Sequence, residues 1–385
     1  MRTSRRALLS ALAAGAALAV TACSPPASDG TTTTESPAAG GSSSAVAGDP
    51  KTAKSAADLG GMEALIAAAK KEGQLNVIAL PPDWANYGEQ ISTFSTKYGI
   101  KVNSAQPDGS SQDEVNAVKQ LKGTDRAPDV LDMGAAVAVA NTDLYAPYQV
   151  ATWADIPDAQ KEATGLYVQD YGGYMSIGYD SAKVPDVTSV ADLLKPEYKG
   201  KVALNGDPTQ ANAALNGVMM ASIANGGSVD DIAKGVDFFG RLKKAGNFIP
   251  VQATSATVKN GTTPVVFDWD YLSAAAKAQV PTWKVFVPKE AVLGGYYNQA
   301  INADAPHPAA ARLWQEFLFS DDGQNLWLKG GARPVRMDAM TKAGTIDAAA
   351  AAALPPVEGT PVFMSVEQST KASDALKTTW QKAIS

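Results

Sequence analysis

From about residue 58 onward, helical and extended sequence patterns alternate, and this alternation constrains the fold more than any other feature. Residues 60–73 place apolar side chains at helical spacing and end at Gly73, directly before the short apolar run QLNVIAL. The same unit, a helix followed by a strand, recurs in residues 83–105 and again in residues 110–134. Repeated units of this kind predict an α/β fold with a mostly parallel sheet and helices on both faces.

Three loops directly follow the predicted strands of this first part. They are PPDWANY at residues 81–87, QPDGSSQ at residues 106–112 and DMGAA at residues 132–136. Ligands of open α/β sheets bind beyond the carboxyl ends of the strands. We therefore expect these loops to line a binding site.

The second half of the chain starts a new set of elements. Residues 167–187 are strand-like, carry paired glycines, and lead into a further helix and strand at residues 189–208. After residues 294–308 the chain enters an amphipathic helical region at residues 309–331, whose Trp314 and Trp327 we assign to the core. The simplest arrangement is a discontinuous first lobe that the chain leaves for a second lobe and then rejoins.

The N-terminus has the pattern of an export signal. Three arginines within residues 1–6 precede 14 uncharged, mostly apolar residues, too few to span a bilayer. The following VTAC resembles the bacterial lipobox, which predicts cleavage after residue 22 and lipidation of Cys23, the only cysteine in the chain. The stretch SRRALL also resembles the twin-arginine signal of proteins that are exported folded.

Composition limits the partners of the mature protein. Residues 23–50 are rich in Ser, Thr, Gly, Ala and Pro and are predicted to form a disordered tether. Loss of the three leader arginines leaves 30 basic against 39 acidic residues, a formal charge of −9. An acidic protein of this kind is not expected to bind nucleic acid or an anionic membrane surface, so its membrane contact should be the lipid anchor only.

Four stretches, taken in order, resemble the solute-binding lipoproteins of bacterial ABC importers. They are AAAKKEGQLNVIA, APDVLDMG, LLKPEYKGKVALNGDP and HPAAARLWQEFLFSDDGQ, spread between about residues 58 and 336. The chain is similar to the two-lobed group that handles ferric iron, thiamine, polyamines and phosphonates. The resemblance implies a periplasmic-binding-protein-like (type II) clamp, a monomer that captures a small solute and delivers it to a permease and its ATPase.

The clamp implied by the resemblance has two hinge crossings. They map to about residues 177–182 and 297–300. The expected organisation is signal peptide 1–22, tether 23–50, first lobe 51–178, second lobe 179–297, and a return to the first lobe with C-terminal helices in 298–385.

Two aspartates in VVFDWDYL are the leading candidates for contact with a solute. Alternation along the strand turns Asp268 and Asp270 to one side and Trp269 to the other, unless the turn has already begun. We expect Asp270 to cap the helix that follows. If Asp268 faces the cleft, it needs a positive group on the solute or an arginine, because an unpaired buried carboxylate is costly.

Aromatic residues form the second candidate group. Trp84 and Tyr87 lie in the first loop, Tyr174 follows the paired glycines, and Tyr296 and Tyr297 stand at the return crossing. Rings in these places can stack on a flat solute or hold a cation. Ferric-iron members of the resembled group use adjacent tyrosines, whose phenolates are hard donors, but their pair corresponds here to FDWDY, which offers one tyrosine.

The third candidate group would hold an anion. Ser110 and Ser111 open one predicted helix, and Thr209 and Gln210 open another, so hydroxyls and free N–H groups meet at positive helix ends. Each pair alone reads as simple capping. If both face the cleft, a phosphonate or phosphate ester becomes the better solute.

We expect no catalysis, no cofactor and no metal. The chain lacks G-x-S-x-G, the P-loop and G-x-G-x-x-G, and its single histidine, His307, has no second histidine as a metal partner. A carboxylate-dependent hydrolase stays open as the alternative. The preferred solute is an amine-bearing compound (a polyamine or a thiamine-like cation), then a phosphonate, then ferric iron. The candidate ligand-binding residues are Asp83, Trp84, Tyr87, Ser110, Ser111, Tyr174, Asp207, Thr209, Asp268, Trp269, Asp270, Tyr296 and Tyr297.

Overall fold

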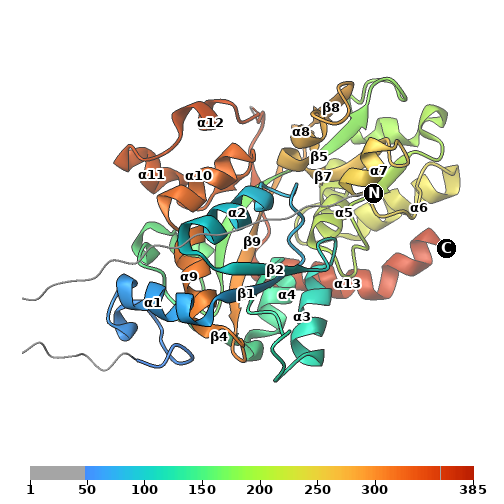
Figure 1. Cartoon of the computed structure of the whole chain (residues 1–385). Coiled ribbons are helices and arrows are strands. Elements are labelled where there is room, and N and C mark those ends of the chain that lie inside the picture. Colours follow the sequence, from blue (N-terminus) through green and yellow to red (C-terminus); the bar gives the residue numbers. More distant parts are fainter. Residues whose placement is uncertain (1–47, 356) are drawn as a thin grey trace, which may run out of the picture. The chain divides into compact units, whose positions relative to one another are not determined.

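The structure is a computed structural model that describes residues 48–355 and 357–385 (Figure 1). The expected signal peptide, Cys23 and most of the expected tether lie outside these residues. Among the described residues, no helix has the length and apolar character that a membrane span requires.

The first part of the chain alternates helix and strand as its pattern predicts. Helix α1 ends at Gly73, which adopts the left-handed conformation (φ 73°) that glycine tolerates best. The elements of this part are α1 (Met62–Glu72), β1 (Gln74–Ile78), α2 (Tyr87–Tyr98), β2 (Lys101–Ala105), α3 (Ser111–Gln120), β3 (Val130–Met133), α4 (Ala135–Ala140) and β4 (Tyr145–Ala146), with a 3-10 helix at Ala57–Leu59 and another at Thr142–Leu144.

The remaining elements follow the long strand β5 (Val168–Asp180). They are β6 (Val202–Leu204), α5 (Asn212–Ala224), α6 (Ala233–Ala245), α7 (Ser255–Lys259), β7 (Val265–Trp269), α8 (Asp270–Ala276), β8 (Trp283–Phe286), β9 (Leu293–Asn302), α9 (Pro308–Leu318), α10 (Asp321–Lys329), β10 (Arg333–Pro334), α11 (Met337–Ala343), α12 (Ala348–Ala352), β11 (Val362–Phe363) and α13 (Val366–Ile384). Short 3-10 helices occupy Trp153–Asp155, Asp158–Gln160, Val190–Leu194 and Pro196–Tyr198.

The sheet is mixed, so the prediction of a mostly parallel sheet was wrong. Strands β1 and β2 form a separate parallel pair, and β6–β7 and β9–β11 are also parallel. The long strands β5 and β9 are antiparallel to each other, and β3, β4, β7, β8 and β10 pair with them in antiparallel fashion. The cause is the return of the chain along β9, which reverses its direction beside β5.

Strand β5 changes partners along its length. It pairs with β9 as far as Tyr174 and with β7 from Met175 onward. Between Gln169 and Gly172 its register shifts, and a Cβ on Gly172 would lie 2.2 Å from the carbonyl oxygen of Gly295 on β9. Glycine at this position therefore allows the two long strands to approach closely.

Aromatic side chains fill the main core. Trp314 and Trp327 are both completely buried, as predicted, and the ring of Phe94 meets that of Trp314 edge to face at 5.1 Å. The last helix, α13, packs against α6 and α5 and also against α4 (Figure 1). It thus contacts segments that the expected organisation assigns to both lobes.

Candidate functional site

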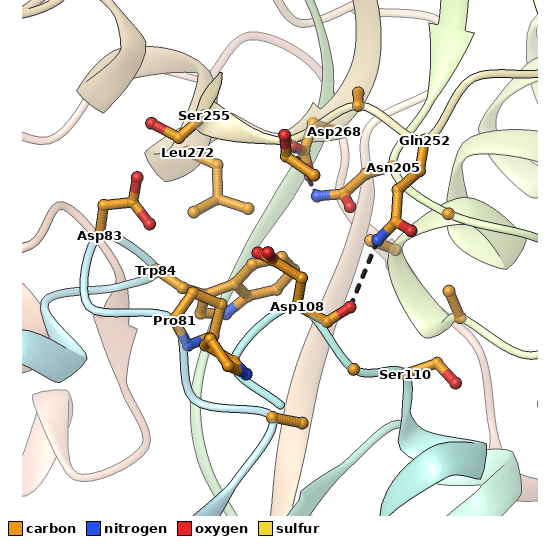
Figure 2. A pocket seen from close by; sticks show the side chains of 18 of the residues that line it. Pro81, Asp83, Trp84, Asp108, Ser110, Asn205, Gln252, Ser255, Asp268 and Leu272 are labelled. Carbon is orange, nitrogen blue, oxygen red and sulfur yellow. Dashed lines mark hydrogen bonds between the residues drawn. The ribbon is translucent and has the colours of Figure 1, made fainter. Parts of the chain in front are cut away.

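A cavity of about 510 Å³ opens where the ends of several strands meet (Figure 2). One wall comes from the loops after β1 and β2, together with Asp132 at the end of β3. The other wall comes from the loop after β6, residues 252–255 and the segment that begins at Asp268. Gln252 bridges the two walls, since its Nε2 donates a long hydrogen bond of 3.5 Å to the carbonyl oxygen of Asp108.

The cavity lining is strongly acidic. Seven carboxylates contribute to it, and no lysine, arginine or histidine does among the described residues. Carboxylates that share a cavity without a counter-charge raise its electrostatic energy, and a cation relieves it. The seven are Asp83, Asp108, Asp113, Glu114, Asp132, Asp207 and Asp268.

Asp132 is the most buried aspartate of the lining, with 7% of its surface exposed. Its Oδ2 accepts hydrogen bonds from the hydroxyls of Tyr87 at 2.7 Å and Tyr171 at 3.0 Å. Its Oδ1 is buried and has no hydrogen-bond partner among the described residues. Burial raises the pKa of Asp132 to about 7, although the two tyrosine hydrogen bonds favour the ionised form.

A hydrogen-bond network fixes the two tyrosines behind Asp132. Trp84 donates its Nε1–H to the Tyr171 hydroxyl oxygen at 2.8 Å, and Gln299 donates from Nε2 to the Tyr87 hydroxyl oxygen at 3.0 Å. The same Gln299 nitrogen lies 3.0 Å from Oδ2 of Asp170, a second buried carboxylate whose pKa is raised by burial and by Asp132. Tyr87, a predicted ligand contact, is completely buried and does not line the cavity, so it positions Asp132 instead.

Asp268 lies on the opposite wall, near the end of β7. Its Oδ2 accepts a hydrogen bond from Nδ2 of Asn205 at 2.9 Å, and its Oδ1 accepts one from the Trp269 backbone N–H at 2.8 Å (Figure 2). Burial raises the pKa of Asp268 to about 7, since these two bonds compensate only part of the desolvation. Strand alternation turns the neighbouring Trp269 into the core, where it is completely buried.

Asp270 does not reach the cavity, and the prediction that it caps the following helix was wrong. It is the first residue of α8, and Trp269 occupies the cap position without a side-chain bond. The Asp270 carboxylate is fully buried and pairs with Arg333 at 2.8 Å, while its Oδ1 accepts the Tyr174 backbone N–H at 3.0 Å. Asp270 thus ties β10 to β5 and α8.

The aromatic candidates divide into two groups. Trp84 and Tyr297 line the cavity, with ring centroids 5.7 Å apart and nearly perpendicular. Tyr174 and Tyr296 do not line it. They pack against Phe363 of β11, and the Arg333 guanidinium lies 4.5 Å from the Tyr174 ring centroid. Because neighbouring strand residues face opposite sides, β9 separates Tyr296 from Tyr297, and the two cannot act as one tyrosine pair.

The two helix starts proposed for an anion differ from each other. Ser110 caps α3 as predicted, in a reciprocal capping box with Asp113, and both Ser110 and Ser111 line the cavity. Helix α5 begins only at Asn212, so the prediction that Thr209 and Gln210 open it was wrong. Asp207 lines the cavity and accepts hydrogen bonds from Thr209, which does not line it.

Asp132, Glu114, Asn205 and Gln252 are among the polar cavity residues that were not predicted as ligand contacts. Asp132 sits within the apolar run VLDM, which reads as buried strand, although the loop DMGAA begins with it. Glu114 lies on α3, where it accepts the Asp132 backbone N–H at 2.8 Å. A rule that also asked for charged residues at the ends of buried strands would have found Asp132.

The single histidine and the acidic clusters give no metal site in the described part of the chain. No group of three or more histidines, cysteines, aspartates or glutamates there has the arrangement to hold a metal ion. His307 instead contacts Asp129 through Nδ1 and Gln74 through Nε2, both at 2.8 Å, and the Asp129 contact raises its pKa. It therefore serves as a packing and hydrogen-bonding residue at the start of α9.

Comparison with known proteins finds one matching family and several solved structures with a similar fold. A family model described as "Bacterial extracellular solute-binding protein" matches residues 128–354, more than half of the chain. Iron-bound HitA from Pseudomonas aeruginosa is 19% identical and aligns over 80% of this chain and 99% of its own, with a TM-score of 0.58. AfuA from Actinobacillus pleuropneumoniae, with fructose-6-phosphate bound, is 17% identical over 80% and 97%, with a TM-score of 0.61.

A third structure, provisionally described as a spermidine/putrescine ABC transporter from Listeria monocytogenes, is 12% identical over 80% of this chain and 99% of its own, with a TM-score of 0.56. At these identities the likenesses show the fold, which is the two-lobed α/β clamp of type II periplasmic binding proteins. The expected fold class is therefore confirmed.

Proposed function

Because the chain belongs to the family of bacterial extracellular solute-binding proteins, we propose that it captures an amine-bearing cation in its acidic cavity and presents it to an ABC importer. Membership makes it an exported solute-binding protein and not an enzyme, and its structural neighbours are also binding proteins. The alternative of a carboxylate-dependent hydrolase has no support.

The charge of the cavity lining carries this proposal. Seven carboxylates and no basic side chain surround the space, within the part of the chain described. Asp132 and Asp268 both have pKa values of about 7, which means that burial opposes their charged forms. A cation placed between them would stabilise both charges, whereas a phosphonate would meet repulsion from every wall.

Aromatic side chains favour an amine further. The Trp84 ring and the Tyr297 ring both contact the same space as the carboxylates. A positive group near such rings is attracted to their faces, and an alkyl chain packs well on them. Amine-bearing compounds combine both features.

Titration calorimetry of the purified protein against three solute classes tests the proposal. We expect heat and saturable binding with amines such as putrescine, spermidine and thiamine, and weaker or no binding with aminophosphonates, phosphate esters and ferric citrate. The matched variants are Asp268→Asn and Asp237→Asn, the latter on the exposed face of α6. Binding of anions alone, unaffected by Asp268→Asn, would refute the amine assignment.

We also propose that Cys23 carries a lipid that holds the protein on the outer face of the cell membrane. The support is the lipobox-like VTAC directly after the apolar leader. Replacing Cys23 by serine should release the protein into the medium or periplasm while solute binding stays unchanged. Retention of the Cys23→Ser protein in the membrane fraction would contradict the anchor.

A further inference from the structure

One buried carboxylate oxygen of the cavity lining, Oδ1 of Asp132, has no hydrogen-bond partner among the described residues. Asp132 is more than nine-tenths buried, its Oδ2 is held by two tyrosine hydroxyls, and its Oδ1 accepts no hydrogen bond from the described residues. The backbone N–H of the same residue is already bonded to Glu114. A buried acceptor of this kind costs free energy until a donor reaches it.

The groups around Asp132 cannot supply that donor. Tyr87 and Tyr171 donate their hydroxyl protons to Oδ2. Glu114 of α3 and Asp170 of β5, whose pKa values are raised by burial and by Asp132, make no hydrogen bond to Oδ1. Tyr297 is the remaining titratable group of the lining near Asp132. Burial raises the pKa of Tyr297, and Asp132 raises it further. No basic side chain lines the cavity among the described residues. No donor among the described residues reaches Oδ1, so an N–H group of a bound solute can fill this place.

We propose that Asp132 anchors a cationic group that carries N–H donors, a primary ammonium or a guanidinium, so that the site selects such solutes over quaternary ammonium compounds. This inference rests on the proposed function, which it narrows. A quaternary nitrogen has charge but no N–H, so it leaves Oδ1 without a hydrogen bond.

Quaternary ammonium groups are bound instead by cages of aromatic faces. The rings that would complete such a cage here are engaged elsewhere. Tyr171 stacks on Trp327 with centroids 4.3 Å apart, and Tyr87 meets Trp327 edge to face at 4.8 Å, all three being completely buried. Within the described part of the chain, only Trp84 and Tyr297 present rings to the cavity. Two rings nearly perpendicular to each other do not enclose a trimethylammonium group.

The test compares matched solutes by titration calorimetry. The probes are putrescine and its bis-trimethylammonium analogue, which share the same carbon chain and formal charge. Because a hydrogen bond to a charged group is strong, we expect putrescine to bind about 10-fold to 100-fold more tightly. In Asp132→Asn this preference should fall to within about 3-fold, whereas the surface variant Asp237→Asn should keep it.

The outcomes separate the two proposals. If the quaternary analogue binds the wild-type protein as tightly as putrescine, the role of Asp132 is refuted while cation capture stands. If Asp132→Asn keeps the full preference, another residue supplies the acceptor and the inference is again refuted. If neither cation binds, both proposals fall. The wild-type comparison needs no variant, so it decides the matter even if Asp132→Asn does not fold.

Discussion

Replacing Asp132 by asparagine should stabilise the solute-free protein, and by an amount that grows with pH. The pKa of Asp132 is about 7 in the folded protein, against an ordinary value of 3.8 for an aspartate. At pH values between 3.8 and about 7, the Asp132 carboxyl group is mostly protonated in the folded protein and mostly ionised in the unfolded chain. The free energy of unfolding therefore decreases as pH rises through this window, by up to about 1.4 kcal/mol per pH unit for one group.

The size of the effect follows from the same two values. Integration from about pH 4.5 to about pH 7.5 gives a loss of about 3 kcal/mol from Asp132 alone. Asparagine keeps the acceptor oxygen for Tyr87 and Tyr171 but cannot ionise, so Asp132→Asn should not suffer this loss. At each pH, the difference between the unfolding free energies of Asp132→Asn and wild type no longer contains the contributions of titrating groups that do not interact with Asp132.

Urea unfolding at several pH values measures this difference. Wild-type, Asp132→Asn and the surface control Asp237→Asn are compared without solute. We expect the stability advantage of Asp132→Asn over wild type to increase by about 3 kcal/mol across the range, and that of the control to stay nearly constant. An Asp132→Asn advantage that does not change with pH would refute the raised pKa of Asp132, which is the sign that burial opposes its charge.

Three further predictions concern other parts of the molecule. Asp268→Asn should weaken binding of an amine by about 2 kcal/mol or more in calorimetry, because one buried charge of the pair is lost. Arg333→Met leaves the carboxylate of Asp270 buried without its partner, so urea unfolding should show a loss of about 3 to 5 kcal/mol, of which Asp270→Asn in the same chain should recover a part. Gly172→Ala would place a Cβ 2.2 Å from the carbonyl oxygen of Gly295, so the melting temperature should fall clearly. The control variant Lys101→Ala, which changes an exposed side chain, should have little effect on the melting temperature.

Local patterns predicted the elements of the fold better than their pairing. The helical spacing before Gly73 and the apolar run after it correspond to α1 and β1. The direction of the sheet was missed, because period-two alternation indicates which side a residue faces but not which strand lies beside it. The antiparallel pairing of β5 with β9 joins segments more than one hundred residues apart, and no local signal encodes it.

The same limit explains the mixed success at the site. The rule that sites follow strand ends led to Asp83, Trp84 and Asp268, all of which line the cavity. It could not distinguish Tyr296 from Tyr297, since the face of β9 that meets the cavity depends on the strands beside it. It included Asp132 in the expected loop DMGAA but did not single it out as a ligand contact, because a charge among apolar residues reads locally as part of a strand.

The positions of the two high-pKa carboxylates suggest how capture and closure are linked. Asp132 lies on β3 and Asp268 on β7, and these strands are joined through the long strands β9 and β5, which overlap the expected crossings. Burial raises the pKa of Tyr297, which stands on β9 within the cavity lining, and both carboxylates raise it further. A ligand shifts a conformational equilibrium only by its differential affinity for the two states.

We expect a cation that reaches both Asp132 and Asp268 to have such a differential affinity, because the two carboxyl groups lie on opposite walls of the cavity. A monoamine too short to contact both should bind without closing the clamp. Small-angle X-ray scattering distinguishes these cases: we expect the radius of gyration to decrease with a diamine and to stay unchanged with a short monoamine. If both solutes reduce the radius of gyration equally, contact with one wall of the cavity is sufficient for closure. The link between the two carboxylates would then be refuted.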